Sequence, residues 1–444
     1  MPESGPPAAP APRRPRLPRP PRLLRVLRHR DFRLVWLAQS ASILGDRIVT
    51  IALALFVIDL TGSASDLGLV LAAGTIPLIG FLVLGGVWAD RLPRHRVMVV
   101  TDLARFALHA GLAGLILAGT VEVWEIAVIE ALFGTAEAFH RPAAFGLLPQ
   151  TVPEGEIQEA KAATAVFDNA AEFLGPALGT ALVLGIGAGP AFGFDAATFL
   201  LSAALLTRVR PRARTPAAAD PPGRRALGAE VREGFRAVRS RTWVWATLAA
   251  FCVALFAGLA PWFVLGPVVA REQYGDIAVF GLVASALGAG TVVGSLVGAR
   301  WRPRYPMRAA MLAMLLWPVS VILYAAGLTL VVVFPVTVLA GTGVALFDVW
   351  WETALAERIP PDLLSRVSSY DWMVSLGLLP LGFLVAGPLG QSVGTVEVLL
   401  AGSIVAVLAY LAGLIPRATR MLERGVDEPR GQILSDPHRG RPLT

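Results

Sequence analysis

The sequence predicts an all-α membrane protein in which twelve transmembrane helices form two six-helix halves. Three observations predict it. Hydrophobic residues make up 55% of the 444 residues and charged residues only 16%, a balance that soluble globular proteins rarely reach. Apolar runs long enough to cross a bilayer recur along the chain. The two halves of the chain also resemble each other in the order and spacing of short motifs.

Each apolar run is long enough to cross a bilayer with some tilt. The twelve expected spans are 32–59, 65–89, 97–119, 123–148, 157–186, 190–208, 242–270, 276–299, 307–327, 329–356, 363–391 and 395–416. They divide the chain into a disordered basic tail (1–30), a first bundle (31–209), a linker (210–241), a second bundle (242–416) and a C-terminal tail (417–444). Within the linker, Ala226 to Arg239 could form an amphipathic helix on the membrane surface.

The connections between the expected spans fall into two groups that differ in charge. Basic residues occupy alternate connections, namely Arg91, Arg94 and Arg96; Lys161; Arg208 through Arg241; Arg300, Arg302 and Arg304; and Arg358 and Arg366. The other connections carry acids and one arginine, Arg271. An even number of spans with this asymmetry predicts a multi-pass protein of the bacterial inner membrane with both termini in the cytoplasm. The basic residues thus mark topology, and we expect no nucleic-acid partner.

An internal repeat supports the division into halves. Gly134-Thr135 and Pro153 match Gly341-Thr342 and Pro360 at one offset, 341 − 134 = 360 − 153 = 207. Six-helix repeats around a central site are typical of secondary transporters. The chain has no stretch suited to a nucleotide-binding domain, so transport is expected to use an ion gradient or to be passive. A single cysteine, Cys252, and scattered histidines indicate no metal site, and no cofactor or enzymatic activity is expected.

Ionisable residues inside the spans are candidates for function, because each costs about 2.5 to 3.5 kcal/mol to insert. Asp168 and Glu172 lie four apart, on one helix face. Two close carboxylates in low dielectric cannot easily both ionise, so one could carry a proton. The alternative is that they pair with Arg105 or Arg141. Asp46 either exchanges a proton or makes a structural contact beside Arg47.

Other charged residues have spacings that favour ion pairs. Asp102 and Arg105 are three apart, and Glu137 and Arg141 four apart, so both are expected to be structural ion pairs, with Asp102, Arg105 and Arg141 buried. Glu137 lies deep enough to take part in proton coupling. In the second half, Asp348, Glu352 and Asp371 are expected at gates or interfaces.

The loop after the second span has the pattern G-x-x-x-D-R-x-x-R, formed by Gly86, Asp90, Arg91 and Arg94. It resembles the signature loop of the major facilitator superfamily. Gly175, Pro176 and Gly179 in the fifth span resemble part of a helix-5 antiporter motif, which implies export in exchange for protons.

Further motifs resemble the enterobactin-exporter and macrolide-efflux branch of the superfamily. They are Leu44-Gly45-Asp46, Leu60-Thr61-Gly62-Ser63, Asp102-Leu103-Ala104-Arg105, Arg141-Pro142-Ala143 and Val152-Pro153. The resemblance implies that Asp90 gates the protein by contacting the start of the eleventh span, at Leu363, Ser365 or Arg366, where the helix dipole favours a carboxylate.

The function that follows is proton-coupled efflux of a small amphiphilic compound, such as a drug, a macrolide-like molecule or a siderophore, by a monomer in the lipid bilayer. The alternatives are uptake or passive carriage of a metabolite, and a non-transporting membrane sensor. The cavity is expected to have aromatic walls, although the same side chains could instead face lipid. The candidates are Trp262, Phe263, Trp317, Trp350, Trp351 and Trp372.

Overall fold

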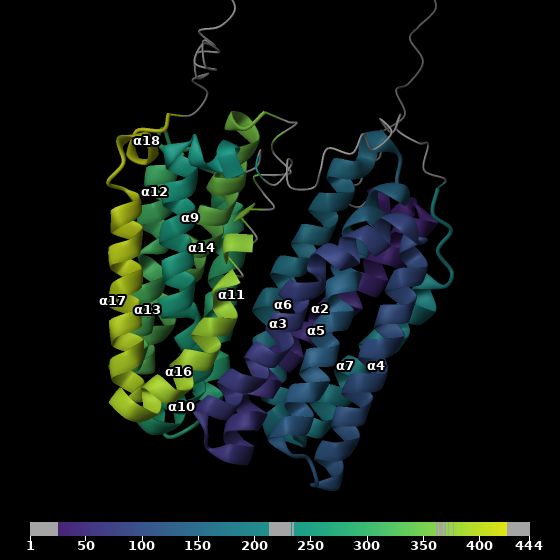
Figure 1. Ribbon diagram of the computed structural model, residues 1–444, viewed down its shortest axis with the longest axis horizontal. Coiled ribbons are helices and arrows are strands. Elements are labelled where there is room, and N and C mark those ends of the chain that lie inside the picture. The colour runs from purple at the N-terminus through teal and green to yellow at the C-terminus, as the bar shows by residue number, and fades with distance from the viewer. Residues whose placement is uncertain are drawn as a thin grey trace, which may run out of the picture.

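The computed structural model describes residues 25–212, 232, 235–360, 363, 367, 370–371, 373–375 and 377–423, with Asp90 described by its backbone alone. The elements of this part of the chain are all helical and form two bundles side by side (Figure 1). Most of the two predicted tails and most of the surface helix predicted for Ala226 to Arg239 lie outside the described residues. The described part of the N-terminal tail contains the short helix η1 (Val26–Arg28), where disorder was predicted, and the described part of the C-terminal tail contains a short helix as well.

Six long helices form the N-terminal bundle. They are α2 (Arg30–Thr61), α3 (Ala64–Arg91), α4 (Arg94–Ala118), α5 (Val123–Leu147), α6 (Ile157–Ile186) and α7 (Ala188–Leu206). The connections are short, and Gly62 shows why: it ends α2 with φ of 66°, where its N–H bonds to the carbonyl of Ile58. This left-handed conformation favours glycine, so the chain reverses at once into α3.

The C-terminal bundle has the same number of crossings. They are α9 (Thr242–Ala254) continued by the π-helical turn η4 (Leu255–Leu259) and α10 (Ala260–Tyr274); α11 (Ala278–Arg300); α12 (Pro306–Met314) with α13 (Leu316–Ala325); α14 (Leu330–Arg358); α16 (Leu379–Val393); and α17 (Thr395–Gly413). The short α18 (Arg417–Arg420) follows.

Eleven of the described helical segments are long and apolar enough to span a membrane. Helix α5 is not among them, because Glu125, Glu130, Glu137 and Arg141 interrupt it. A charge exposed to lipid costs several kcal/mol, and α5 avoids that cost by packing against α3 and α4 inside the bundle. With α5 the described chain makes twelve crossings, which confirms the predicted fold class.

We call the face at which α2 begins and α17 ends the terminal face, and the opposite one the far face. Near the far face the bundles touch, through α3 against α16 and α6 against α11 (Figure 1). Glycines make this contact close: a Cβ on Gly68 would lie 2.2 Å from the carbonyl oxygen of Phe383, and one on Gly387 would lie 2.4 Å from Cα of Ser65.

An ion pair also joins the bundles at the far face, where Arg271 Nη2 lies 3.0 Å from Asp59 Oδ1. Toward the terminal face the bundles diverge (Figure 1). A cavity of about 820 Å³ follows the inner side of the N-terminal bundle, from Phe32 and Leu148 near the terminal face to Leu53 and Leu71 deep inside. The halves are therefore closed together at the far face and spread apart at the terminal face.

Candidate transport site

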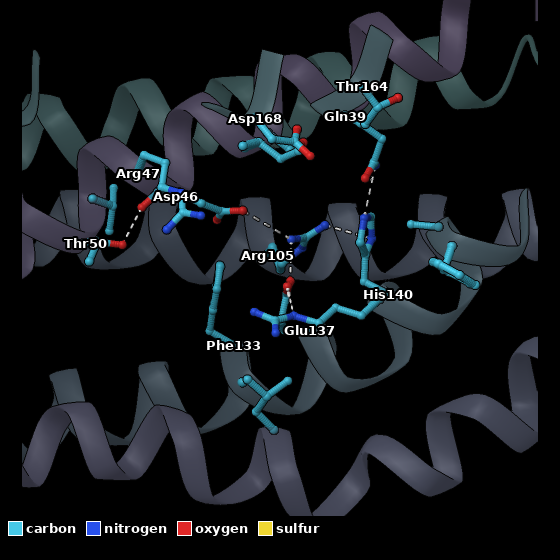
Figure 2. A pocket seen from close by; sticks show the side chains of 18 of the residues that line it. Gln39, Asp46, Arg47, Thr50, Arg105, Phe133, Glu137, His140, Thr164 and Asp168 are labelled. Carbon is cyan, nitrogen blue, oxygen red and sulfur yellow. Dashed lines mark hydrogen bonds and ion pairs between the residues drawn. The ribbon is translucent and has the colours of Figure 1, made fainter. Parts of the chain in front are cut away.

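Arg105 on α4 lies at the centre of the polar residues of the N-terminal bundle (Figure 2). Its side chain is 1% exposed. Nη1 donates to Glu137 Oε2 on α5 at 2.7 Å, and Nη2 binds Asp102 one turn earlier on α4. The guanidinium carbon also lies 4.4 Å from the centroid of the Phe199 ring. A planar guanidinium can serve two carboxylates and an aromatic face together, which an ammonium cannot do as well.

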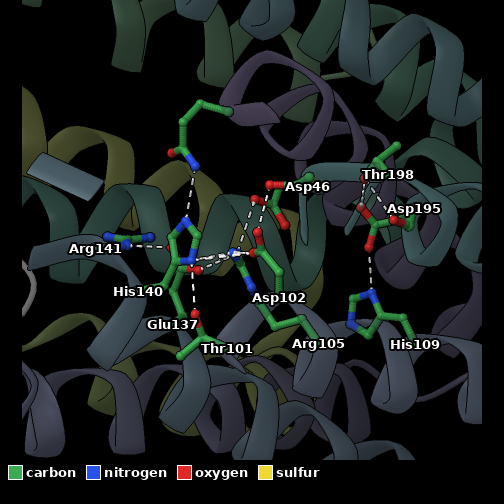
Figure 3. Close-up of polar contacts among 12 residues, drawn as sticks. Asp46, Thr101, Asp102, Arg105, His109, Glu137, His140, Arg141, Asp195 and Thr198 are labelled. Atoms are coloured by element: carbon green, nitrogen blue, oxygen red, sulfur yellow. Dashed lines mark hydrogen bonds and ion pairs between the residues drawn. The ribbon is translucent and has the colours of Figure 1, made fainter. Parts of the chain in front are cut away.

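The network extends to two more helices (Figure 3). Ser202 Oγ on α7 donates to Asp102 Oδ2 at 2.6 Å. On α2, Asp46 Oδ2 lies 4.0 Å from Arg105 Nη1. Three carboxylates from α2, α4 and α5 thus face one buried cation.

His140 on α5 belongs to the same network, although the sequence suggested that it was isolated. Its Nδ1 lies 2.8 Å from Arg105 Nη2 and 3.1 Å from Thr101 Oγ1, and its Nε2 lies 3.2 Å from the amide nitrogen of Gln39. Because a guanidinium only donates, His140 Nδ1 accepts from Arg105. Histidine therefore connects the ion pairs to α2.

Asp46 and Arg47 do not pair with each other but point to different partners. Asp46 faces Arg105, whereas Arg47 Nη2 lies 2.6 Å from Glu172 Oε2 on α6. The alternative partners expected for Glu172, Arg105 and Arg141, are thus replaced by Arg47. The Arg47–Glu172 pair is less buried than the Arg105 network, with 45% and 42% of the two side chains exposed.

Asp168 lies one turn before Glu172 and lines the cavity (Figure 2). Its Oδ1 atom is buried and has no hydrogen-bond partner among the described residues. The two carboxylates predicted as one coupling unit therefore differ: Glu172 is paired, and Asp168 is left facing the cavity.

The glycines of the fifth span bring α6 close to α2. A Cβ on Gly175 would lie 2.3 Å from Cβ of Arg47, and one on Gly179 would lie 2.5 Å from the carbonyl oxygen of Ile48. Pro176 between them is buried within the continuous helix. This part of the antiporter-like motif sets the separation of two cavity-lining helices.

A second polar cluster was not predicted. His109 Nδ1 on α4 lies 2.5 Å from Asp195 Oδ2 on α7 (Figure 3). Its Nε2 lies 3.8 Å from Glu130 Oε1 on α5. Asp195 is 0% exposed. The signal was present in the sequence, since Asp195 and Glu130 are ionisable residues within apolar runs. Their partner is remote in sequence, so no spacing rule could join them.

Two expectations are corrected. Arg141 was expected in a buried ion pair; it pairs with Glu137 at 2.7 Å, but 49% of its side chain is exposed because it borders the cavity. The predicted aromatic wall is not formed by those of the named tryptophans that the structure describes. Trp262, Trp317 and Trp351 are buried in the C-terminal bundle, where they fill space between helices.

Phe263 and Trp350 also belong to the C-terminal bundle, and Trp372 lies outside the described residues. The aromatic residues that line the cavity come from the N-terminal bundle instead. They are Phe32, Trp36, Phe133 and Phe145.

The predicted gate is only partly described. Gly86, Arg91 and Arg94 lie at the α3–α4 connection, and Arg94 donates to the carbonyl oxygen of Gly146 at 2.5 Å. That bond ties the connection to the end of α5. The Asp90 side chain lies outside the described residues.

Of the residues predicted to contact Asp90, Leu363 is described, and Ser365 and Arg366 lie outside the described residues. The contact between Asp90 and the eleventh span stays a prediction.

In the C-terminal bundle, the acids predicted for gates or interfaces gather around α14. Trp351 Nε1 donates to Asp371 Oδ2 at 2.9 Å. Asp348 and Glu352 are exposed and lie four apart on α14.

The sequence profile of the transmembrane secretion effectors matches residues 23–431. The chain belongs to this family. It is an efflux branch of the major facilitator superfamily, which confirms the resemblance seen in the sequence. The transporter has relatives named macrolide efflux protein A, of Streptococcus pyogenes (21% identity, 86% of this chain and 95% of the relative), and multidrug efflux pump Tap, of Mycolicibacterium fortuitum (25% identity, 86% and 95%).

A further relative is the uncharacterised MFS-type transporter YfiS of Bacillus subtilis, with 27% identity over 49% of this chain and 52% of the relative. That match spans about half the length of the relative. Among solved structures, the nucleoside transporter NupG is similar with a TM-score of 0.66 and 14% identity, over 87% of this chain and 98% of that one. At this identity the likeness shows the fold alone. Its family, together with the apolar helices, makes the transporter a multi-pass membrane protein with a small-molecule substrate.

Proposed function

We propose that this transporter expels a small amphiphilic cation from the bacterial cytoplasm in exchange for protons. One observation carries the proposal: the interior of the N-terminal bundle holds more carboxylates than cations. The acids away from the ends of its spans are Asp46, Asp102, Glu130, Glu137, Asp168, Glu172 and Asp195, and the cations inside the spans or at the cavity are Arg47, Arg105, Arg141 and Lys161. The excess among these described residues is 7 − 4 = 3 carboxylates.

Such an excess is unstable in low dielectric unless protons or a cationic ligand neutralise it. Either can serve, so protons and a cationic substrate compete for the same groups. The cavity walls also include apolar side chains, among them Leu53, Leu78 and Phe133. A cation with an apolar body therefore fits best, and the same charge excess disfavours an anionic siderophore.

Among the acids proposed for coupling, Glu137 and Glu172 are held in ion pairs. Asp168 has an unpartnered oxygen at the cavity and Asp46 makes only a long contact with Arg105. We therefore assign the exchangeable proton to Asp168, with Asp46 as its nearest alternative. The substrate displaces this proton from the cavity.

The charge of the connections and the names of the relatives support export as the direction of transport. The arginine-rich connections at the terminal face favour a cytoplasmic position for it under the positive-inside rule. The spread terminal face then corresponds to an inward-open state, ready to take substrate from the cell. Relatives named for efflux support export rather than uptake. One chain holds the whole cavity, so a monomer suffices.

The test uses everted membrane vesicles energised by a proton gradient, with ethidium and tetraphenylphosphonium as probes. The wild type is expected to accumulate a probe and to release protons on its addition. Asp168→Asn should abolish gradient-driven accumulation while energy-independent exchange of probe continues. Gln158→Ala, a change of an exposed residue near the start of α6, is the control. Accumulation by Asp168→Asn that still collapses with a protonophore would refute the assignment, and a wild type that moves no protons would refute the antiport.

A further inference from the structure

His109 sits between two carboxylates contributed by other helices. Its Nδ1 lies 2.5 Å from Asp195 Oδ2 and its Nε2 lies 3.8 Å from Glu130 Oε1. His109 is 2% exposed and Glu130 9%. Both His109 Nε2 and Glu130 Oε1 are buried without a hydrogen-bond partner among the described residues. Both residues also line the cavity, so protons can reach them.

The site is built around the imidazole. The His109 ring stacks on Phe133 with centroids 4.3 Å apart and planes 9° from parallel, and the edges of Phe192 and Phe199 close its sides. These contacts fix the ring so that its two nitrogens point at the two carboxylates. An imidazole held in this way makes a directed relay between Asp195 and Glu130.

A glycine of α2 makes room for the Asp195 carboxylate. A Cβ on Gly45 would lie 2.1 Å from Asp195 Oδ1 and 2.6 Å from Thr198 Oγ1. Gly45 belongs to the Leu44-Gly45-Asp46 motif, so the motif places a carboxylate on α2 and admits a second one from α7. This explains a glycine that the sequence alone left without a role.

The proton balance of the cluster is simple. With Asp195 and Glu130 ionised and His109 neutral, the Nδ1 hydrogen is donated to Asp195, and the Nε2 lone pair faces a carboxylate oxygen. Two acceptors that face each other repel. One added proton turns this into an imidazolium that donates to both carboxylates, which changes the net charge from −2 to −1 and satisfies both buried atoms.

We propose that Asp195, His109 and Glu130 form a second proton-binding site, separate from Asp168, in which one proton joins α5 to α4 and α7. Its role in transport rests on the proton antiport proposed above. A distance of 3.8 Å must shorten by about 1 Å to become a hydrogen bond. Binding a proton therefore draws α5, which lines the cavity, toward α4, and releasing the proton frees it. The site couples protonation to the position of a cavity helix.

The surrounding charges leave this cluster in need of a proton. On its own helix His109 faces Arg105, which is already bound to Asp102 and Glu137. From α2, Asp46 adds a further carboxylate beside Asp195. No arginine or lysine forms an ion pair with Asp195 or Glu130 within the described part of the chain. A proton is thus the available counter-charge.

The test is nitrogen NMR of histidine side chains in the full-length transporter in lipid, without any substrate. The chain has only five histidines, so His109→Asn identifies the His109 signals. On acidification from about pH 8 to about pH 5, the wild-type His109 signals should move from neutral imidazole to imidazolium. Glu130→Gln should abolish that change over the same range. Asp168→Asn, the matched control, should leave it intact, and the other histidine signals report whether each variant folds.

A His109 signal that responds to pH identically in the wild type and in Glu130→Gln would overturn the proposal. Loss of the response in Asp168→Asn would show one shared site and refute a separate one. These outcomes are independent of the vesicle experiment. If the wild type moves no protons with any probe but His109 titrates as expected, the antiport fails and the proton-binding site stands.

Discussion

Replacing Arg105 by Met should destabilise the N-terminal bundle more than any other single removal of a cation from the cavity. The side chain is 1% exposed and faces Asp102, which is 0% exposed, as well as Glu137. Breaking a buried ion pair from one side typically costs about 3–5 kcal/mol, because the remaining charge is left uncompensated. Glu137 borders the cavity and can regain water, so about 3 kcal/mol is the better figure for the variant.

The assay is thermal unfolding of purified protein in detergent, followed by tryptophan fluorescence. At roughly 2 °C per kcal/mol, Arg105→Met should lower the apparent Tm by about 6 °C. Arg105→Lys should recover only part of this, since an ammonium lacks the planar fork that holds two carboxylates. Arg105→Met combined with Asp102→Asn should melt above Arg105→Met alone, because the orphaned buried charge is gone.

The matched control is Arg141→Gln. Arg141 pairs with the same Glu137, but its side chain is 49% exposed, so its loss should cost less than about 1 kcal/mol. The reasoning is refuted if Arg105→Met melts like the wild type, or if Arg141→Gln is as destabilising as Arg105→Met. Either result would mean that burial does not determine the strength of these pairs.

Two further predictions concern the ends of the bundles. Gly387→Ala should open the far face, because its Cβ would meet the backbone of Ser65 at 2.4 Å; a cost of about 1 kcal/mol reduces the closed-to-open ratio about fivefold. The assay is the yield of a disulfide between Asp59→Cys and Arg271→Cys in a Cys252→Ala background, and Gly387→Ala should lower this yield. Gly80→Ala, which has open space around it, is the control and should leave the yield unchanged. An unchanged yield in Gly387→Ala contradicts the prediction. At the terminal face, Glu423 accepts from Tyr305 and Arg304 at 3.1 and 2.8 Å, and these bonds lower the pKa of Glu423. The contact should persist above the ordinary glutamate pKa of about 4.3 and be lost as pH falls through the lowered value. A spin label at Arg420→Cys should therefore become mobile in acid, and it should be mobile at every pH when Glu423→Gln is added. Equal mobility of the label in the two proteins at neutral pH would rule the contact out.

The sequence by itself determined the fold class. Apolar length, basic connections and the internal repeat each arise from solvation, which acts on every span independently. It therefore predicted twelve crossings, including α5 with its charges. Residues three or four apart, such as Asp102 and Arg105, could also be paired, because helical geometry alone places them together.

Only the tertiary structure decided which distant charges meet. His109 and Asp195 are 86 residues apart in sequence yet 2.5 Å apart in space, and Arg47 rather than Arg105 takes Glu172. Such partners depend on the rotation of each helix about its axis and on where glycines such as Gly45 let backbones approach. Solvation determines that a helix crosses the membrane. Packing between helices determines which face of each helix contacts which neighbour, and these contacts form the site.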